Sequence, residues 1–368
     1  MGIAEGKRAG GMNSFLQIGA RRVGPGESVY VVAELSANHN QDFEEAVRLV
    51  HAASACDADA VKLQTYTPDT LTIRCDNEHF RVGKGTIWEG KNLYQLYSEA
   101  YTPWEWQPKL KQLAGEMGLA LFSTPFDATA VDFLEQMDVW AYKIASFELV
   151  DLPLLRKVAG TGKPVLLSTG MATLAEIEEA VATLDAAGTR ELALLKCTSA
   201  YPAPAEEMNL RSLSALAERF GVPVGLSDHT LGIAVPVAAT ALGACIVEKH
   251  LTLSRSAPGP DSAFSLEPEE FRRMVHAIRE AEKALGEVRF GASEPEAASR
   301  VFRRSLFVVE DMQAGEEFTT RNVRSIRPGY GLHPRHLEEI LRCRASGAIP
   351  RGTPLSWSRV AVAKSSSA

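Results

Sequence analysis

A short apolar segment followed by a stretch with helical periodicity occurs eight times along this chain of 368 residues. The eight segments are VYVVAELS (29–36), DAVKLQTY (59–66), ALFSTPF (120–126), AYKIASFE (141–148), PVLLSTGM (164–171), LALLKCTS (192–199), VPVGLSDHT (222–230) and CIVEKHLT (245–252). Between them, stretches such as FEEAVRLVHAASA and AEIEEAVATLDAAG repeat apolar residues at helical spacing. Strands that alternate with helices predict a parallel sheet, because parallel neighbours need a crossover connection.

Eight such units in roughly 260 residues predict an α/β protein with a closed (β/α)₈ TIM barrel. A doubly wound open sheet is the alternative, but its first strand would lead into a Gly-rich phosphate loop, and AELSANHN stands there instead. We expect a barrel catalytic domain over 1–285, a polar linker over 286–300 and a small β-rich domain over 301–368.

Composition excludes several classes of function. The formal net charge is −7, which disfavours nucleic acid as a partner. The five cysteines are widely spread and form no CxxC motif, as is typical of reduced thiols in a cytoplasmic protein. No run of about 18 apolar residues is present, so we expect neither a membrane span nor membrane binding.

The connection after the second predicted strand is far longer than the ~2–6 residues usual for such loops. It covers residues 67–103 and is rich in aromatic side chains, among them Trp88, Tyr94 and Tyr97. Two interpretations are compatible with each other: a satellite cluster that holds the insertion in place, and a wall of the substrate pocket.

Polar side chains occur at the carboxyl ends of all eight predicted strands, where barrel enzymes carry their active sites. Some occur in pairs at spacing two, which are Glu34 and Ser36, Lys62 and Gln64, Ser227 and His229, and Glu248 and His250. Others occur singly, among them Ser123, Thr124, Lys143, Ser146, Ser168, Thr169, Lys196 and Ser199. Because burying so many polar groups without partners is costly, this pattern predicts a ligand site at the barrel mouth.

Two histidines end the seventh and eighth predicted strands, which are neighbours in a barrel. His229 and His250 are therefore placed to share a divalent cation, with Glu34 and Glu248 on flanking strands. No cysteine falls within this predicted group, which favours Mn²⁺ or Mg²⁺ over a structural Zn²⁺.

Lys62 and Lys143 combine with hydroxyl side chains but with no arginine clamp. Ammonium groups and short hydroxyl donors suit a phosphate or a phosphorylated carboxylate. A lysine that forms a Schiff base with a carbonyl substrate remains an open alternative.

Several segments together closely resemble the sialic acid synthase family. They are AELSANHNQDFEEA, VKLQTY, FSTPFD, YKIASFE, LSTGM, KCTSAYP, GLSDHT, VEKH and GPDSAFSLEP. The tail SLFVVEDMQAGEEFTTRNVRSIRPGYGL is similar to the antifreeze-like (SAF) domain that follows the barrel in that family. The resemblance runs in order over residues 15–362. Within the family, AYTPWEW and GPDSAFSLEP are most similar to the pseudaminic acid synthases.

The resemblance implies that phosphoenolpyruvate condenses with an open-chain amino-sugar aldehyde, and that phosphate leaves by C–O cleavage. The implied cofactor is Mn²⁺, with Mg²⁺ or Co²⁺ as alternatives, held by His229 and His250. The implied catalytic residues are Glu34, as base or orienting group for water, with Lys62, Lys143 and Glu248.

The resemblance also assigns substrate contacts. The phosphoenolpyruvate positions match Lys62, Thr124, Lys143, Ser146, Ser168, Ser199 and Ser227. Ser199 departs from the family, which more often has Asn there. The sugar positions match Gln64, Tyr201 and Asp261. Arg327 matches an arginine that the SAF domain supplies to the partner subunit, which implies a domain-swapped homodimer.

Three alternatives remain open at the level of the sequence. The sugar could be the precursor of N-acetylneuraminic or legionaminic acid. The barrel could instead use a phosphorylated sugar, as related keto-deoxy sugar acid synthases do, although the aromatic insertion offers no second phosphate pocket. The third alternative is a non-catalytic carbohydrate-binding protein of polysaccharide assembly.

Overall fold

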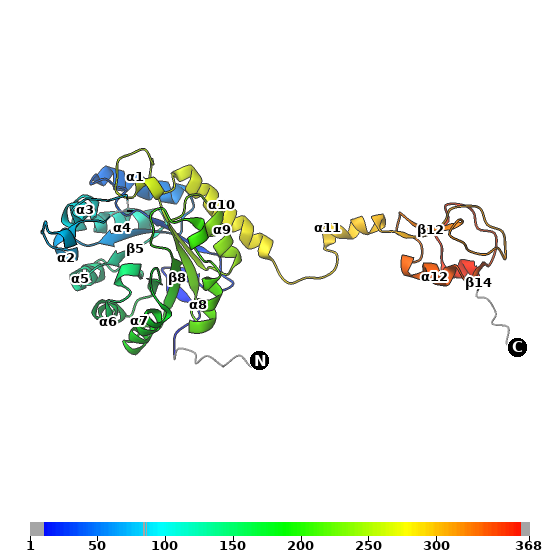
Figure 1. Ribbon diagram of the computed structural model, residues 1–368, viewed down its shortest axis with the longest axis horizontal. Coiled ribbons are helices and arrows are strands. Elements are labelled where there is room, and N and C mark those ends of the chain that lie inside the picture. The colour runs from blue at the N-terminus through cyan, green and yellow to red at the C-terminus, as the bar shows by residue number, and fades with distance from the viewer. Residues whose placement is uncertain (1–10, 84, 86, 362–368) are drawn as a thin grey trace. The chain divides into compact units, whose positions relative to one another are not determined.

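The computed structural model describes residues 11–361 except 84 and 86 (Figure 1). Contacts within the chain divide it into two compact units, Met1–Gly286 and Glu287–Ala368. Each unit has its own hydrophobic core, and each is described by itself.

The first unit is a closed barrel of eight parallel strands. In chain order these are β3 (Tyr30–Glu34), β4 (Ala60–Thr65), β5 (Ala120–Pro125), β6 (Tyr142–Ile144), β7 (Val165–Ser168), β8 (Leu192–Cys197), β9 (Val224–Asp228) and β10 (Ile246–His250). The last strand pairs with the first, because β10 forms a parallel ladder with β3. The predicted TIM barrel is therefore confirmed, and an open sheet is excluded for this unit.

Helices surround the strands of the barrel (Figure 1). They are α1 (Phe43–Ala55), α4 (Gln107–Glu116), α5 (Ala128–Gln136), α6 (Leu152–Ala159), α7 (Leu174–Ala186), α8 (Ser212–Phe220), α9 (Ala234–Ala241) and α10 (Pro268–Leu285). Side-chain caps start several of them: Asp42 begins α1, Asp127 begins α5, and Thr173 begins α7 in a capping box with Glu176. These caps satisfy backbone N–H groups that a helix leaves unpaired at its first turn.

The long connection after β4 contains two further helices. They are α2 (Pro68–Leu71) and α3 (Leu93–Ala100), and Asn92 caps the start of α3 by accepting from the backbone N–H of Tyr94. The insertion that the sequence indicated is thus a folded element attached to the carboxyl end of a barrel strand.

The register of the barrel brings polar residues of different strands to one level. Glu34 lies opposite His250 on one side and opposite Lys62 on the other. Glu248 lies opposite Ser227. Because all eight strands run in the same direction, these carboxyl-end residues meet at one mouth of the barrel.

A two-stranded hairpin that the sequence reading did not predict lies at the opposite end. Its strands are β1 (Leu16–Ile18) and β2 (Arg21–Val23). Arg21 forms an ion pair with Asp59, which directly precedes β4, and the backbone N–H of Gln17 donates to Glu191, which precedes β8. The hairpin therefore packs against the amino ends of the strands.

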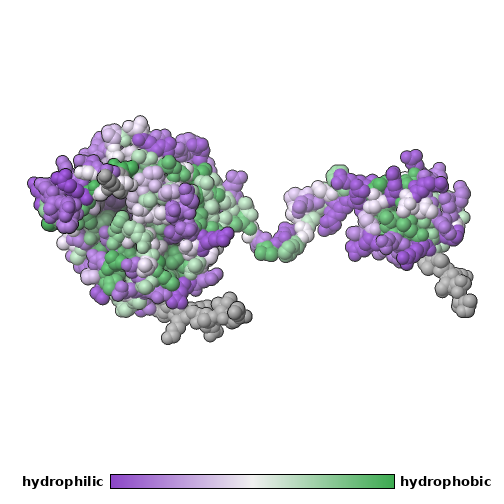
Figure 2. Space-filling view, viewed as in Figure 1, coloured by the Kyte–Doolittle hydropathy of each residue, from purple (hydrophilic) through white to green (hydrophobic). Residues whose placement is uncertain are grey.

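The second unit is small and rich in short strands. Its elements are α11 (Glu294–Ala297), β11 (Ser305–Val308), β12 (Val323–Ile326), α12 (Leu337–Ile340), β13 (Arg344–Ala345) and β14 (Val360–Ala361). Its start carries exposed apolar side chains: Val288 is 92% exposed and Phe290 is 95% exposed. Figure 2 shows hydrophobic and hydrophilic residues mixed over the visible surface of the molecule. Across both units, none of the described helices has the length and apolar character needed to cross a membrane.

A buried ion pair ties β9 to β10 on the outer face of the barrel. The Nζ of Lys249 lies 2.5 Å from Oδ2 of Asp228, and both side chains are 0% exposed. Lys249 also donates to the backbone oxygen of Thr230. The adjacent side chains Ser227 and Glu248 face the cavity, so strand alternation places this ion pair between the strands and the helices.

We predict that Lys249→Met lowers the free energy of unfolding by about 3–5 kcal/mol, because it leaves the Asp228 carboxylate buried without a partner. The double variant Asp228→Asn with Lys249→Met should recover most of that loss. Denaturant unfolding followed by circular dichroism measures both.

The matched control is Lys163→Met, which removes an ion pair with Asp138, a side chain 83% exposed. This control should cost less than about 1 kcal/mol. Equal losses for Lys249→Met and Lys163→Met would contradict the role assigned to the buried pair.

Candidate active site

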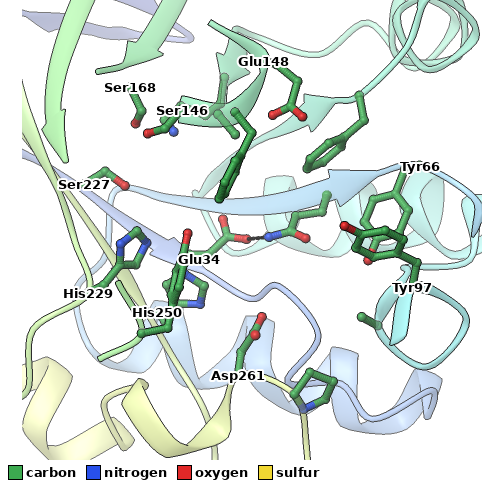
Figure 3. Close-up of a pocket in the computed structure, with 18 of the residues that line it drawn as sticks. Glu34, Tyr66, Tyr97, Ser146, Glu148, Ser168, Ser227, His229, His250 and Asp261 are labelled. Atoms are coloured by element: carbon green, nitrogen blue, oxygen red, sulfur yellow. Dashed lines mark hydrogen bonds between the residues drawn. The ribbon is translucent and has the colours of Figure 1, made fainter. Parts of the chain in front are cut away.

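A cavity of about 500 Å³ opens at the carboxyl ends of the barrel strands. Twelve of the sequence-predicted site residues line it, and Figure 3 shows how several of them converge. They are Glu34, Lys62, Gln64, Lys143, Ser146, Ser168, Tyr201, Ser227, His229, Glu248, His250 and Asp261. A volume of this size is typical of a small-molecule site.

Two lysines and two glutamates form a buried charge cluster at the base of the cavity. The Nζ of Lys62 lies 2.6 Å from Oε2 of Glu34 and 3.7 Å from Oε1 of Glu248. The Nζ of Lys143 lies 3.5 Å from the same Glu248 oxygen. All four side chains are at most 5% exposed. Their charges balance in the absence of ligand, as burial requires.

The same cluster shifts the pKa values of its members in different directions. Burial raises the pKa of Glu34 above the usual value, with Lys62 opposing and Glu248 reinforcing the shift. For Glu248 burial acts in the same sense, but the fields of Lys143 and Lys62 outweigh it and lower its pKa. The cluster therefore contains one carboxyl that accepts a proton readily and one that stays ionised.

The pKa values of the two lysines also shift in opposite directions. Burial lowers the pKa of Lys143. Burial acts the same way on Lys62, but Glu248 and Glu34 outweigh it and raise the pKa of this lysine. Lys62 is thus the more firmly charged of the two, and its Nζ also donates to Oγ1 of Thr124 at 3.1 Å.

Two imidazoles lie side by side near Glu34 (Figure 3). The ring centroids of His229 and His250 are 5.3 Å apart. Nδ1 of His229 lies 3.0 Å from the backbone oxygen of Thr198, an arrangement that leaves Nε2 available to a ligand when Nδ1 is protonated. Burial lowers the pKa of His250 well below its usual range, so this ring is neutral, as a metal ligand must be.

These residues fit a divalent cation with two protein ligands. Nδ1 of His250 is buried and has no hydrogen-bond partner. Within residues 11–361, leaving aside 84 and 86, no group of three or more His, Cys, Asp or Glu side chains is arranged to hold an ion. A bound cation would therefore complete its coordination with oxygen atoms of substrate or water.

Hydroxyl groups and a close backbone approach form another side of the cavity. Oγ of Ser168 is buried without a hydrogen-bond partner, and Ser227 donates to Glu248 at 2.9 Å. The backbone N–H of Gly170 donates to Oγ of Ser146. A Cβ on Gly170 would lie 2.4 Å from Oγ of Ser199, so a larger residue there would displace the surrounding serine hydroxyl groups. Small donors around an open backbone suit anionic oxygens.

A polar chain leads from Glu34 to the edge of the cavity. The amide of Gln64 donates to Glu34 at 3.1 Å and to Ser36 at 3.2 Å, and Ser36 donates to Asp261. Burial raises the pKa of Asp261. Tyr201 stacks against His229 with ring centroids 4.5 Å apart. This chain offers both donors and acceptors to a polyhydroxylated or amide-bearing ligand.

The three remaining predicted residues lie elsewhere. Thr124 is buried behind Lys62, and Ser199 lies next to Gly170. Arg327 belongs to the second unit, where it lines a separate shallow cavity together with Arg303, Arg304 and His333.

A cysteine that the sequence analysis did not assign to the site lies beside the predicted metal ligands. Cys197 lines the cavity, and its Sγ lies 3.8 Å from Nδ1 of His229. Burial raises the pKa of the thiol, but the field and hydrogen bond of His229 outweigh it and bring the pKa to about 7. The spacing-two pattern of KCTS could have revealed it, because Cys197 is two residues before Ser199 on the same strand end.

Glu148 is a second residue that the sequence reading missed. It ends a short 3₁₀ turn, Ser146–Glu148, directly after β6 and lines the cavity. Its Oε2 is buried without a hydrogen-bond partner, and burial raises its pKa to about 7. The segment AYKIASFE contained the signal, since its last residue is a carboxyl at the end of a predicted strand.

Fold and site together define a (β/α)₈ barrel enzyme whose cavity has a base of lysines, carboxylates and hydroxyls. The chain belongs to the NeuB family, whose model matches residues 49–290. The SAF domain model matches residues 303–361.

Curated relatives and solved structures agree with this assignment. The pseudaminic acid synthase of Helicobacter pylori is 47% identical over 332 residues, covering 89% of this chain and 96% of that protein. The pseudaminic acid synthase of Campylobacter jejuni is 44% identical, covering 90% and 96%. The crystal structure of N-acetylneuraminic acid synthetase from Leptospira borgpetersenii matches with a TM-score of 0.70 at 29% identity, covering 79% of this chain and 96% of that one.

We predict that Glu148 makes the barrel less stable as pH rises. The pKa of this carboxyl is about 7 in the folded protein, against an ordinary value of 4.5 in the unfolded chain. Between these two values the folded state therefore binds more protons than the unfolded state. The free energy of unfolding therefore falls across that interval, by on the order of 1–2 kcal/mol for a partly buried group.

The variant Glu148→Gln removes this titration and should flatten the decline between pH 5 and pH 7. Denaturant unfolding of metal-free protein at several pH values measures the difference. Parallel pH profiles for wild type and variant would contradict the prediction.

Proposed function

We propose that this chain condenses phosphoenolpyruvate with 2,4-diacetamido-2,4,6-trideoxy-L-altrose, releases phosphate and forms pseudaminic acid. The observation that carries the proposal is the buried cluster of two lysines and two glutamates beside the paired imidazoles of His229 and His250. The identity of 44–47% to pseudaminic acid synthases over most of the chain supports the choice of sugar.

The reaction balances as follows. The methylene carbon of phosphoenolpyruvate attacks the aldehyde carbon with its π electrons and forms the new C–C bond. The aldehyde oxygen takes up a proton. Water adds to the oxocarbenium carbon and loses a proton, which produces a tetrahedral carbon bearing phosphate and hydroxyl. The C–O bond to phosphate breaks, its electron pair leaves with phosphate, and the hydroxyl proton is lost to form the ketone.

We assign the anionic ends of phosphoenolpyruvate to the lysines and hydroxyl groups. Lys62 and Lys143 supply charge, and Ser168 and Ser227 supply short donors to phosphate and carboxylate oxygens. Thr124 supports this surface from behind by accepting a hydrogen bond from Lys62, and the hydroxyl groups of Ser146 and Ser199 flank Gly170.

We assign different roles to the two glutamates. Glu34, whose pKa burial raises, is the base that accepts the proton of the attacking water. Glu248 stays ionised between the two lysines and holds their ammonium groups toward the substrate. This division explains why one site contains two carboxylates of opposite tendency.

His229 and His250 would hold the divalent cation, and Mn²⁺ is our first choice, with Mg²⁺ or Co²⁺ as alternatives. When bound, such a cation supplies a Lewis acid for the aldehyde oxygen. The sugar is held by Gln64, Tyr201 and Asp261, whose amide, hydroxyl and carboxyl groups line the cavity.

We further propose that the second unit completes the site of a partner subunit in a domain-swapped homodimer, with Arg327 as the contributed cation. The similarity of this unit to SAF domains supports its inclusion in the enzyme. We assign the reaction to the cytoplasm, where phosphoenolpyruvate is available. The five cysteines, none of which forms a disulfide, agree with a reducing compartment.

We expect phosphate release from phosphoenolpyruvate to require a divalent cation such as Mn²⁺ and a sugar acceptor, and to be fastest with the trideoxy sugar. A colorimetric phosphate assay with a panel of sugars measures this. Treatment with EDTA should abolish release, and added Mn²⁺ should restore it. Preference for N-acetylmannosamine would overturn the choice of sugar, and absence of release with every free or phosphorylated sugar would overturn the proposed synthase.

For Arg327→Ala we expect KM for the sugar to rise at least tenfold, while KM for phosphoenolpyruvate changes less than threefold, because the lost charge would act on the sugar. Steady-state kinetics with each substrate varied in turn measures the two constants. The matched control is Arg324→Ala on the neighbouring strand β12, which should change neither. Equal loss for both substrates would contradict the role assigned to Arg327.

A further inference from the structure

The cavity has a second face whose chemistry is opposite to that of its base. Five apolar side chains of the insertion at 67–103 line it, and we call them the insertion wall. They are Leu71, Val82, Leu93, Leu96 and Ala100. Figure 3 shows the same side of the cavity at Tyr66 and Tyr97, across from Ser227 and His229.

Only part of the insertion is apolar, and its apolar wall faces the cavity. The segment carries many charged residues, among them Asp69, Arg74, Glu89, Lys91 and Glu99. None of the charged residues that the structure describes in this segment lines the cavity. Several are paired instead with one another or with polar groups outside it, as Lys91 is with Glu99.

The wall is held in a fixed position by contacts to the barrel. The indole N–H of Trp88 donates to the backbone oxygen of Pro260 at 2.8 Å, and its ring lies 5.3 Å from the ring of Tyr201. Tyr66, which directly follows β4, packs edge-on against Tyr97 of α3 and against Phe126. These contacts attach the insertion to the barrel at two places, and a wall that is already packed against the barrel loses little conformational freedom when a sugar binds.

We infer that the insertion wall is the part of the enzyme that selects deoxygenated, N-acylated sugars. This inference rests on the proposed function. With the aldehyde carbon at the charged base, the far end of the sugar extends toward the wall. A 6-deoxy sugar with an acetamido group on C4 places the C6 methyl and that acetamido methyl on this side, and their burial against Leu93, Leu96 and Val82 is favourable.

A hydroxylated sugar meets the same wall at a cost. A hydroxyl group buried against these side chains exchanges its water partners for apolar contacts. Apolar pockets discriminate against an added hydroxyl only moderately, by roughly 10- to 100-fold in kcat/KM. We therefore expect a moderate difference in kcat/KM between the two sugars and no change in the binding of phosphoenolpyruvate.

The test compares two sugars of the same stereochemistry, 2,4-diacetamido-2,4,6-trideoxy-L-altrose and its 6-hydroxy counterpart, by phosphate release. Wild type should prefer the deoxy sugar by roughly 10- to 100-fold. Val82→Thr and Leu96→Asn each place a polar group of similar shape on the wall, and each should reduce the preference at least fivefold while KM for phosphoenolpyruvate stays within twofold.

The matched control is Val150→Thr, which makes the same change at a side chain 58% exposed that does not line the cavity. It should keep the wild-type preference. Equal use of both sugars by wild type, or an unchanged preference in both wall variants, would overturn the inference and leave the proposed function standing. No phosphate release with either sugar would count against the proposed function itself. If Leu96→Asn does not fold, Val82→Thr alone decides.

Discussion

This site depends on placing two lysines and two glutamates together at the base of a buried cavity. Glu34, Lys62, Lys143 and Glu248 are almost fully buried, and their charges are stabilised by one another and by hydrogen bonds to polar side chains such as Thr124. Such a cluster persists only when several strands hold it in register. The closed barrel provides this, because the ladder from β10 through β3 to β4 sets His250, Glu34 and Lys62 at one level.

Much of the barrel could be predicted from the sequence, because strands that alternate regularly with helices are compatible with few topologies. Eight such strand–helix pairs favour a closed (β/α)₈ barrel among them. The hairpin β1–β2 could not. Its strands are three residues each, LQI and RRV, and too short to show a periodicity. What holds it is tertiary: Arg21 pairs with Asp59, and Leu16, Ile18 and Val23 join the core.

The site was predictable where side chains alternate along a strand, and less so where the chain leaves the strand. The alternation of side chains along the predicted strands was enough to identify Lys62 and His250 as site residues from the sequence. Glu148 escaped notice because a 3₁₀ turn, not strand geometry, directs it into the cavity. Cys197 was not predicted as a site residue, because the sequence shows the five cysteines only as widely spread reduced thiols. The direction of the pKa shifts depends on burial and neighbours, which a sequence does not specify.

The ion pair of Asp228 and Lys249 lies one residue away from His229 and His250 on the same two strands. A slip of β9 or β10 by a single position would turn the imidazoles under the helices and push the ion pair into the mouth. An insertion or deletion in these strands would therefore disrupt the site, whereas the segment that carries α2 and α3 lies outside the barrel ladder, where a change leaves the strand register intact. Relatives that handle different sugars can thus diverge in that segment while their catalytic frame stays constant.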